Sequence, residues 1–290
     1  MHNIRDIRKR IRSVRNIGQL TKAVQMISAV KLRKAQEQIL AARPYSFKLK
    51  ETLRELAGRV ELDTHPFFRQ SEWRNVDVVV VTGEKGLCGG FNTNVIRSAA
   101  QFLEETEKGK SAKVFLHPIG KKAKEYFKKK KARVRQSYEI AAATARYPDA
   151  QKISDALSSL FVSGKTDAVF FFFNEFKSPL IQKVNREQIL PIEAIERPGP
   201  PGIRIDYRYE PSREEILERL LPRNLSFQVY RILLESSAGE HGARMTAMDS
   251  ATKNTERLMD EFTLLRNRAR QAGITRELIE IVTGAEALKG

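Results

Sequence analysis

Apolar residues at both ends of the 290-residue sequence recur at alternating spacings of three and four. The C-terminal series keeps this spacing over four heptads, and its members are Met248, Ala251, Thr255, Leu258, Phe262, Leu265, Ala269, Ala272, Arg276 and Ile279. Such a series lies along one side of a helix, and when it persists for several heptads it predicts a coiled coil. The small residues in the series allow a partner helix to approach closely.

The N-terminal 60 residues carry a similar pattern with two irregularities. Its first members are Ile4, Ile7, Ile11, Val14, Ile17, Leu20, Val24 and Ile27. The steps around Ile17 are both three residues, which we interpret as a stammer in the heptad. A second series begins at Leu32, and Pro44 within it predicts a kink or a brief break. Because neither end can bury its seam alone, we predict that the two ends pair as antiparallel helices.

The segment before the C-terminal heptads also has helical periodicity, from residue 216 onward. Ser212 is placed to cap its start, since Glu215 follows three residues later. Pro222 predicts an interruption, and Gly239 with Gly242 predicts local weakening of the helix.

The middle of the chain alternates between two other patterns. Short apolar runs rich in β-branched and aromatic residues predict strands at 76–82, 113–116 and 168–173, with a further candidate at 183–196. Helical stretches are predicted at 93–107, 121–131 and 151–162. Strand–helix alternation indicates a Rossmann-like α/β layer with a mostly parallel sheet.

We therefore predict an α/β domain inserted between two helices that form a long antiparallel coiled coil. The expected parts are an N-terminal coiled-coil helix at 1–60, an inserted α/β domain at 61–211 and a C-terminal coiled-coil helix at 212–290. The Pro- and Gly-rich segment 198–202 is expected to be an irregular loop between the last two parts.

The charge of the chain is high and uneven. Lys and Arg outnumber Asp and Glu by 52 to 35, a net charge of +17. Residues 1–60 hold 15 basic and 4 acidic side chains, whereas residues 212–285 hold 11 of each. A basic surface of this size favours an acidic partner, such as nucleic acid, anionic lipid or an acidic protein face.

Several classes of protein are disfavoured. No stretch approaches the roughly 20 apolar residues of a membrane span. The Arg-rich start lacks the apolar core of a signal peptide. Cys88 is the single cysteine, so an intramolecular disulfide is impossible and a reducing compartment is suggested. We therefore expect a soluble chain whose membrane association comes through a partner.

The Gly-rich loop 82–92 follows a predicted strand and precedes a predicted helix, which is where phosphate-binding loops lie. Its spacing matches neither common phosphate-loop motif, so a structural turn is favoured over a nucleotide site. Cys88 within this loop is favoured as a small structural residue over a reactive thiol. The four scattered histidines, His2, His65, His117 and His241, lack metal-ligand spacing. We predict no catalytic group, no metal and no cofactor.

Residues 121–135 contain nine basic residues and one Glu, with Tyr126 and Phe127 among them. A nucleic-acid surface is one interpretation. A solvated helix face or a docking surface is favoured over it.

Four separated segments resemble the gamma subunit of F-type ATP synthases. The most specific is 269–285 (ARQAGITRELIEIVTGA), which fits the family's C-terminal signature. The block 243–248 (ARMTAM) with Ala251 and Asn254 precedes it. Near the start, 11–17, 21–26 and 31–35 are similar to the family's opening helix, and 86–90 (GLCGG) with Asn92 is similar to its central-domain turn. The resemblance covers essentially the whole chain.

The resemblance implies a central rotor stalk that couples ion flow through the membrane sector to ATP synthesis at the beta subunits, with no catalytic residue of its own. It implies one copy per complex, with a hexamer of three alpha and three beta subunits, the epsilon subunit and the c-ring as partners. The location would be peripheral, on the cytoplasmic face of a bacterial inner membrane. The two-cysteine redox segment of chloroplast relatives is absent, so thiol regulation is not expected.

The resemblance also implies roles for particular residues. Torque-transmitting contacts with beta subunits or with the opposing helix would come from Lys22, Arg33, Lys34, Arg244, Gln271, Thr275, Glu277 and Glu280. Ile279, Val282 and Leu288 would run in an apolar bearing. Two other hypotheses stay open: a basic coiled-coil protein that binds nucleic acid, and a stand-alone α/β enzyme with helical arms.

Overall fold

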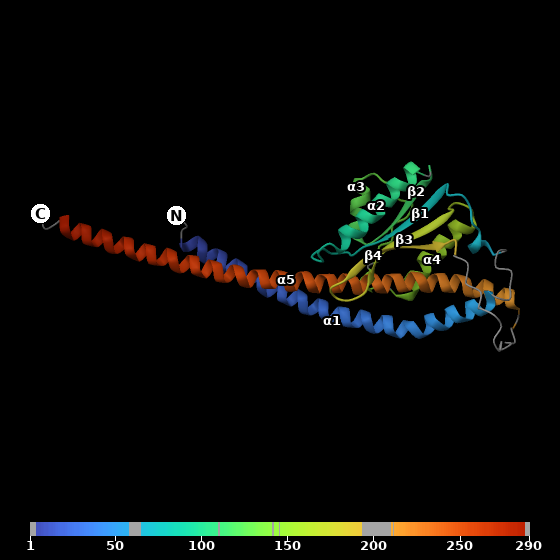
Figure 1. Cartoon of the computed structure of the whole chain (residues 1–290), viewed down its shortest axis with the longest axis horizontal. Coiled ribbons are helices and arrows are strands. Elements are labelled where there is room, and N and C mark those ends of the chain that lie inside the picture. Colours follow the sequence, from blue (N-terminus) through green and yellow to red (C-terminus); the bar gives the residue numbers. More distant parts are fainter. Residues whose placement is uncertain are drawn as a thin grey trace. The chain divides into compact units, whose positions relative to one another are not determined.

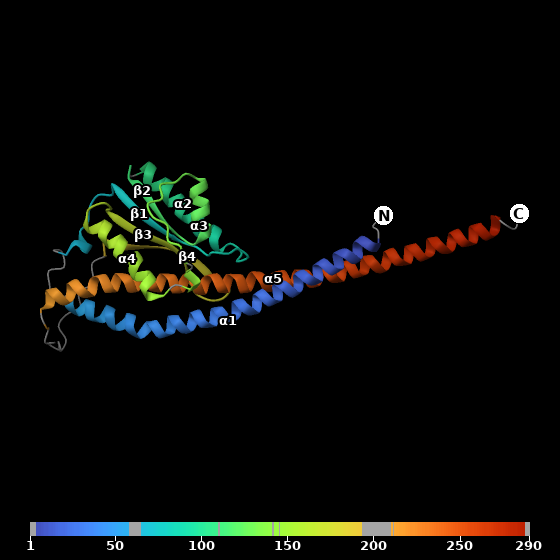
Figure 2. The same cartoon turned by 180° about the vertical axis from the view of Figure 1, so that it is seen from behind.

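Figures 1 and 2 show a computed structural model of the chain, which describes residues 4–57, 65–109, 111–140, 142–144, 146–192, 210 and 212–287. Two compact units can be distinguished. We call Met1–Ile27 with Met245–Gly290 the two-helix unit, and Ser28–Arg244 the sheet unit. Helix α1 (Ile4–Ala57) and helix α5 (Arg213–Ala287) each run through both units.

The two-helix unit is an antiparallel pair formed by the beginning of α1 and the end of α5. The hydroxyl oxygens of Thr21 and Thr252 are 2.8 Å apart, and Gln25 Nε2 donates to Asp249 Oδ1 at 2.9 Å. Residue numbers rise along α1 as they fall along α5, which confirms the predicted antiparallel pairing of the two ends.

The seam of α1 does not follow the predicted residues. Ile7 and Ile11 are buried as predicted, but Ile17, Leu20 and Ile27 are 48%, 63% and 56% exposed. The seam continues instead through smaller or polar residues, which are Gly18, Thr21, Gln25 and Ser28. These positions continue the spacing of three and four without a slip, so the predicted stammer is wrong. The helix keeps its register because Gly18 allows close approach to Thr255 and because Thr21 and Gln25 find polar partners on α5.

The seam of α5 is paired over only part of the predicted length. Met248 and Thr255 are buried, and the members from there to Ala269 are at least partly buried. Ala272, Arg276 and Ile279 are exposed, so the prediction that they pack in the seam is wrong. Thr21 of α1 lies opposite Thr252 of α5. Ile4 is 17 residues before Thr21, so in an antiparallel pair of helices it lies opposite about residue 269 of α5. Figure 1 shows α5 continuing past the beginning of α1.

Two prolines lie inside helices without interrupting them. Helix α5 runs through Pro222, where Leu221 and Leu225 are buried and Ser226 Oγ donates to the Pro222 carbonyl at 3.0 Å. The predicted interruption is therefore wrong, because packing of the flanking leucines offsets the lost backbone hydrogen bond. Helix α1 also continues through Pro44 from Ile4 to Ala57, and Figure 1 shows this helix as curved and unbroken.

The sheet unit holds a four-stranded sheet in the order β2-β1-β3-β4. The strands are β1 (Asn75–Val81), β2 (Lys113–Ile119), β3 (Ala168–Phe176) and β4 (Gln182–Leu190). Strand β1 is parallel to β2 and β3, and β4 returns antiparallel to β3. The helices between them are α2 (Phe91–Gly109), α3 (Lys121–Lys129) and α4 (Tyr147–Val162), with short 3-10 turns at Pro66–Phe68 and Ala142–Thr144. The predicted Rossmann-like α/β layer is confirmed.

Both faces of this sheet are covered, which explains why its strands are continuous apolar runs. Val79, Val81, Phe171 and Phe173 face one core, which also contains residues of α4, α5 and the end of α1. Phe170 and Phe172, from the alternate positions of β3, face a second core with α2 and α3. Four consecutive phenylalanines thus supply both layers.

Two glycines of α5 lie in close contact with other parts of the sheet unit. A Cβ on Gly239 would lie 3.2 Å from the Phe91 ring, and one on Gly242 would lie 3.2 Å from Pro179 Cα. The helix is continuous through both glycines, and each is a point of close contact; the predicted local weakening stays a prediction. The predicted cap is confirmed, since the Glu215 amide donates to Ser212 Oγ at 3.2 Å.

Some predictions fall on residues outside the described ranges. These include segment 198–202, the end of the candidate strand 183–196, and the residues around both expected domain boundaries, 60/61 and 211/212. Among the described helices, none combines the length and apolar character needed to cross a membrane.

Candidate partner-contact surfaces

The predicted contact residues near the start of the chain lie on exposed positions of α1. Lys22, Arg33 and Lys34 are all exposed. The Arg33 guanidinium pairs with Glu37 one turn away, at 3.1 Å, and its side chain is 84% exposed. An exposed pair of this kind is worth little and is easily exchanged for another partner.

The predicted contact residues near the end of the chain lie where α5 has passed the beginning of α1. Gln271, Thr275, Glu277 and Glu280 are exposed, as are the proposed bearing residues Ile279 and Val282. Leu288 lies outside the described residues. Ile274, Leu278 and Ile281 are exposed as well. Exposed apolar side chains that gather on one stretch of helix are typical of a surface that a partner covers.

Arg244 differs from the other predicted contact residues because its side chain is engaged within the chain. Its Nη2 donates to Glu240 Oε1 at 2.6 Å, and its Nε donates to the Gly86 carbonyl at 3.3 Å. Only 11% of the side chain is exposed. The Glu240 carboxylate lies over Gly83, where a Cβ would come within 2.7 Å of it. Arg244 and Glu240 therefore hold the Gly-rich loop against α5.

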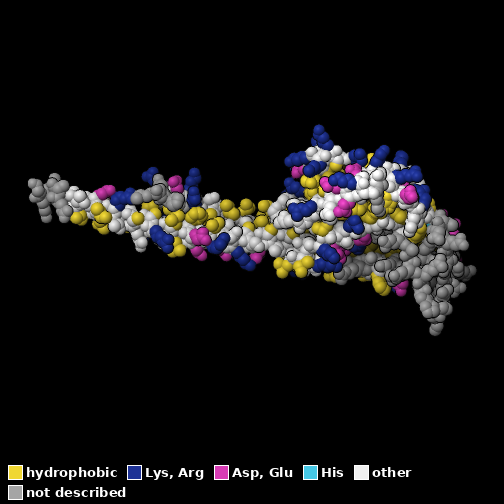
Figure 3. Space-filling model, turned by 45° about the horizontal axis from the view of Figure 1, so that its top comes forward, with side chains coloured by type: hydrophobic (Ala, Val, Ile, Leu, Met, Phe, Trp, Pro, Cys, Tyr) yellow, Lys and Arg dark blue, Asp and Glu magenta, His cyan; other side chains and the backbone are white. Residues whose placement is uncertain are grey.

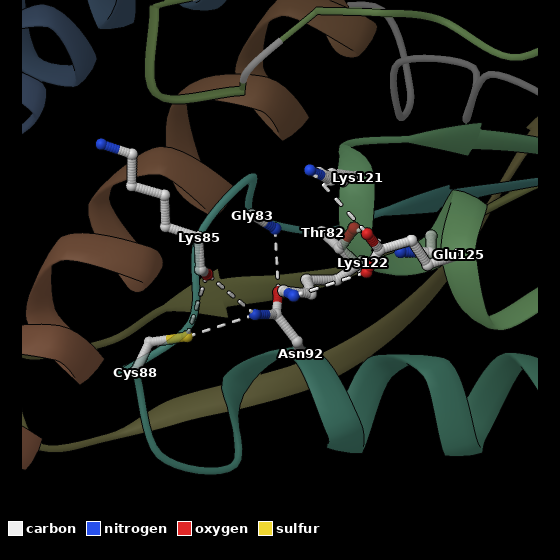
Figure 4. Close-up of polar contacts among 9 residues, drawn as sticks. Thr82, Gly83, Lys85, Cys88, Asn92, Lys121, Lys122 and Glu125 are labelled. Carbon is white, nitrogen blue, oxygen red and sulfur yellow. Dashed lines mark hydrogen bonds and ion pairs between the residues drawn. The ribbon is translucent and has the colours of Figure 1, made fainter.

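The Gly-rich loop 82–92 is organised by its own residues (Figure 4). Asn92 Oδ1 accepts from the Gly83 amide at 2.8 Å, while Asn92 Nδ2 donates to Cys88 Sγ at 3.2 Å and to the Lys85 carbonyl at 3.4 Å. Cys88 is 2% exposed, and burial raises the pKa of its thiol. A buried thiol with a raised pKa is a poor nucleophile. These contacts support the prediction of a structural turn.

His241 lies beside this loop on α5, next to Arg244 in space. Its Nδ1 is 3.5 Å from Arg244 Nη1, and the residue is 4% exposed. Burial, assisted by the charges of Arg244 and Lys31, lowers the pKa of His241 to about 4. The imidazole is therefore neutral at physiological pH, which suits its place beside two cations.

The basic run has one buried face and one exposed face. Ala123 and Phe127 of α3 enter the second core, whereas most lysines point outward. Lys121 and Lys122 approach Glu125 at 3.9 and 3.5 Å, as Figure 4 shows, and Lys124 pairs with Glu139 at 2.7 Å. Figure 3 shows Lys and Arg side chains protruding from the domain that carries this helix.

Sequence reasoning missed an exposed apolar face on α1, because it placed three of its members, Ile17, Leu20 and Ile27, in the seam. The face consists of Ile17, Leu20, Met26, Ile27 and Val30, which are 48–71% exposed. Figure 3 shows hydrophobic side chains along the surface of the helical pair. The uninterrupted spacing of Gly18, Thr21, Gln25 and Ser28 was the signal that could have revealed it.

Sequence reasoning also missed a buried polar group on the sheet. His117 Nε2 lies 2.7 Å from Asp77 Oδ1, with both side chains fully buried, and Arg135 Nε lies 3.4 Å from the same oxygen. Burial raises the pKa of the adjacent Tyr138 to about 12, and the charge of Asp77 adds to the effect. An acidic residue within the valine-rich run 76–81 was the available signal. Among the described residues, no group of three or more His, Cys, Asp or Glu is arranged to hold a metal ion.

Comparison with known proteins places this architecture in a family. A family model described as ATP synthase matches residues 3–288. The ATP synthase gamma chain of Anaeromyxobacter dehalogenans is 46% identical over 292 residues, covering 100% of both chains. That of Geobacter metallireducens is 42% identical over 293 residues, again covering 100% of both. The chain belongs to the ATP synthase gamma-chain family.

Solved structures show the same fold at lower identity. A chain from the Euglena gracilis mitochondrial ATP synthase, in a structure of OSCP, F1 and c-ring, has a TM-score of 0.70 and 21% identity, covering 98% of this chain and 94% of that one. A chain from the central stalk and c-ring structure of the Tetrahymena thermophila enzyme has a TM-score of 0.59 at 21% identity, covering 80% of this chain and 99% of that one. The gamma-chain fold thus combines the α/β domain with paired terminal helices.

Proposed function

We propose that this gamma chain is the central rotor stalk of an F-type ATP synthase, which couples ion flow through the membrane sector to ATP synthesis at the beta subunits. The observation that carries the proposal is the end of α5, where unpaired helix presents exposed apolar and polar side chains together. Such a helix has no advantage in an isolated chain, because its apolar surface stays in water. It suits a shaft that is enclosed by a surrounding partner.

The proposed contacts are weak and exchangeable, as a rotating shaft requires. Lys22, Arg33 and Lys34 on α1, and Gln271, Thr275, Glu277 and Glu280 on α5, are exposed polar residues. Exposed ion pairs of this kind contribute about 1 kcal/mol or less each. Ile279 and Val282 would run in the apolar bearing. We assign Arg244 to the same contact region, where it would act through the Gly-rich loop that it holds.

The chemistry of ATP would belong to the beta subunits, and this chain would be non-catalytic. The proposed partners are the hexamer of three alpha and three beta subunits, the epsilon subunit and the c-ring, with one copy of the chain in each complex. We propose a peripheral location on the cytoplasmic face of a bacterial inner membrane, reached through the complex.

Co-purification from native membranes tests this proposal. A tagged chain is expected to carry alpha and beta subunits with it in a complex that hydrolyses ATP and pumps ions. Recovery of the chain without alpha and beta subunits would refute the stalk function. The nucleic-acid hypothesis predicts instead that the chain is recovered with DNA or RNA that resists moderate salt.

A paired substitution tests the bearing. Ile279→Asp combined with Val282→Asp is expected to lower ATP-driven ion pumping at least several-fold, since two charges would enter an apolar sleeve. Val162→Asp is the matched control, because Val162 is an apolar residue that is 50% exposed at the end of α4, in the sheet unit. Equal pumping by both variants would contradict the bearing and leave the family assignment intact.

A further inference from the structure

The lysines of α3 and of the two residues that follow it fall into two groups that differ in their partners. Lys121, Lys122 and Lys124, in the first turn, lie within 4 Å of carboxylates of Glu125 or Glu139. Lys128, Lys129, Lys130 and Lys131, at the end of the helix, are all exposed. Within the part of the chain that the structure describes, no ion pair joins these four to a carboxylate. We call residues 128–131 the lysine turn.

The backbone holds the lysine turn in a conformation that its sequence does not favour. Lys131 has φ of +52°, in the left-handed region. The Ala132 amide donates to the Phe127 carbonyl at 3.1 Å, and the Lys131 amide donates to the Lys128 carbonyl at 3.1 Å, which closes the end of the helix. Glycine is the residue that commonly occupies this position, since a side chain there costs about 1 kcal/mol. A lysine occupies a position that glycine would adopt with less strain.

The composition of the lysine turn narrows the class of partner. Lysine is a point charge on a flexible stem and lacks the planar fork with which arginine binds a defined carboxylate or phosphate. The neighbouring aromatic rings are occupied, since Phe127 is buried and Tyr126 is partly buried with its ring against Phe127. Stacking of single-stranded bases therefore has no exposed platform here. A specific protein interface would need a desolvated apolar anchor, and all four residues of the turn are charged.

A cluster of flexible lysines binds well to a surface that carries many mobile anionic groups. Each lysine near an anionic lipid headgroup contributes independently, and the contributions add without a fixed geometry. We propose that the lysine turn is a docking site for the headgroups of an anionic phospholipid surface. The gamma chain would then contact the membrane directly, in addition to its attachment through the proposed complex.

Vesicle binding by the full-length chain tests this proposal independently of the stalk function. The probe is a liposome containing roughly one-third phosphatidylglycerol in phosphatidylcholine, and the readout is the partition coefficient from co-sedimentation. Substitution of all four lysines of the turn by Gln is expected to lower that coefficient by on the order of a hundredfold, and 0.5 M salt is expected to have a similar effect. Vesicles of phosphatidylcholine alone are expected to bind neither chain.

The matched control removes lysines from the same helix. Lys121→Gln, Lys122→Gln and Lys124→Gln together are expected to change the partition coefficient less than threefold, because these lysines already have carboxylate partners. Losses of binding free energy that scale with the number of lysines removed, four against three, would show that only net charge matters and would overturn the proposal. The proposal would also be overturned if the four-lysine variant bound vesicles as strongly as the wild type. A preference of the lysine turn for RNA over vesicles would overturn it too.

A loss of the fold is excluded in the same samples. Trp73 is the single tryptophan, and its ring lies against Phe102 and Phe170 in the second core, which also contains Phe127 of α3. Its fluorescence is expected to be unchanged in both variants. If vesicle binding behaves as expected while alpha and beta subunits fail to co-purify, the lipid contact stands and the stalk function falls.

Discussion

The two units pair the same two helices by different means. In the sheet unit, the end of α1 and the beginning of α5 contribute large apolar side chains to the first core, among them Leu49, Leu53, Leu221 and Leu225. In the two-helix unit, the contact between the helices includes Gly18, Thr21 and Gln25 of α1 against Thr252, Thr255 and Asp249 of α5.

The difference concerns where the apolar side chains point. In the two-helix unit, Ile17, Leu20, Met26 and Ile27 are exposed, and the part of the seam that follows the buried Ile7 and Ile11 is formed by small and polar residues. A seam of small residues lets the helices approach closely but buries little apolar area, so it stabilises the pair weakly. We infer that stability is concentrated in the sheet unit and that the two-helix unit keeps its apolar surface for partners.

The largest expected effect is a truncation in the sheet. Phe171 of β3 is fully buried in the first core. Phe171→Ala is expected to lower the free energy of unfolding by about 3–5 kcal/mol, because it removes buried area and leaves a cavity. Urea unfolding followed by Trp73 fluorescence measures this loss. A loss below about 1 kcal/mol would contradict the inferred concentration of stability in the sheet unit.

The next effect depends on pH. The pKa of His241 is about 4 in the folded chain, below its ordinary value of 6.5. As pH falls through 6.5 the unfolded chain takes up the proton first, so stability is lost between pH 6.5 and about 4. The loss from this group is expected to reach roughly 3 kcal/mol at the acid end.

Unfolding of the wild type and of His241→Gln at several pH values isolates this effect. The difference between their free energies of unfolding is expected to shrink as the pH is lowered from 7 to 4. A constant difference would show that His241 is protonated equally in both states.

A medium effect is expected at an ion pair that ties β4 to α5. Arg231 Nη2 donates to Glu187 Oε2 at 2.7 Å across the two elements, and Nη1 donates to Glu235 Oε1 at 2.9 Å within α5. Glu187→Gln is expected to lower the free energy of unfolding by about 1–2 kcal/mol, since it weakens a charge-assisted hydrogen bond. Glu235→Gln is expected to lower the free energy of unfolding by less. Burial raises the pKa of Glu235 in spite of the opposing charge of Arg231, so the charged form of Glu235 is stabilised less in the folded chain.

Urea unfolding of the two amide variants under the same conditions measures this ranking. Each variant removes one negative charge and keeps the shape of the side chain. A larger loss for Glu235→Gln than for Glu187→Gln would contradict the assignment of the cross-element pair as the stronger one.

A smaller effect is expected in the seam of the two-helix unit. A Cβ on Gly18 would lie 2.9 Å from Thr255 Oγ1. Gly18→Ala is therefore expected to weaken the pair locally by about 1 kcal/mol in spite of the better helix propensity of alanine. Hydrogen exchange of peptides from 4–27 measures the change. Adding Thr255→Ala is expected to restore protection, and failure to restore it would place the strain elsewhere.

The smallest effect is expected on the exposed apolar face. Leu20 is 63% exposed, so Leu20→Ala is expected to change stability by less than about 0.5 kcal/mol. Ile7→Ala is the positive control, since Ile7 is 2% exposed in the seam of the same helix. Hydrogen exchange that is equally accelerated in both variants would show that Leu20 belongs to the seam after all.

Much of the fold follows from local patterns. The runs that became β1, β2 and β3 are apolar and rich in Val and Phe, and a strand covered on both faces requires this composition. The heptad from Met248 to Ala269 predicted a paired helix, and Ser212 predicted its cap. These predictions succeeded because spacing and capping act within a few residues.

The contact residues were less accessible to sequence reasoning. Arg244 was expected to meet a partner or the opposing helix, and the structure gives it Glu240 and the Gly86 carbonyl. Gly239 and Gly242 were predicted to weaken α5, and sequence reasoning did not foresee that they lie in close contact with Phe91 and Pro179. The partners of these residues come from loops far away in sequence, so spacing along the helix carries no information about them.

The sequence by itself determined that both ends are helices with a heptad repeat and that an α/β sheet lies between them. Only the tertiary structure decided which side of α1 faces α5. After Val14 the repeat can continue through Ile17 or through Gly18, and hydrophobicity alone favours Ile17. Gly18 lies in the seam because close contact with Thr255 and the hydrogen bonds of Thr21 and Gln25 are available only on that side. Which residues of α1 are buried thus depends on the contacts that α5 provides, and those contacts come from residues more than 200 positions away in the sequence.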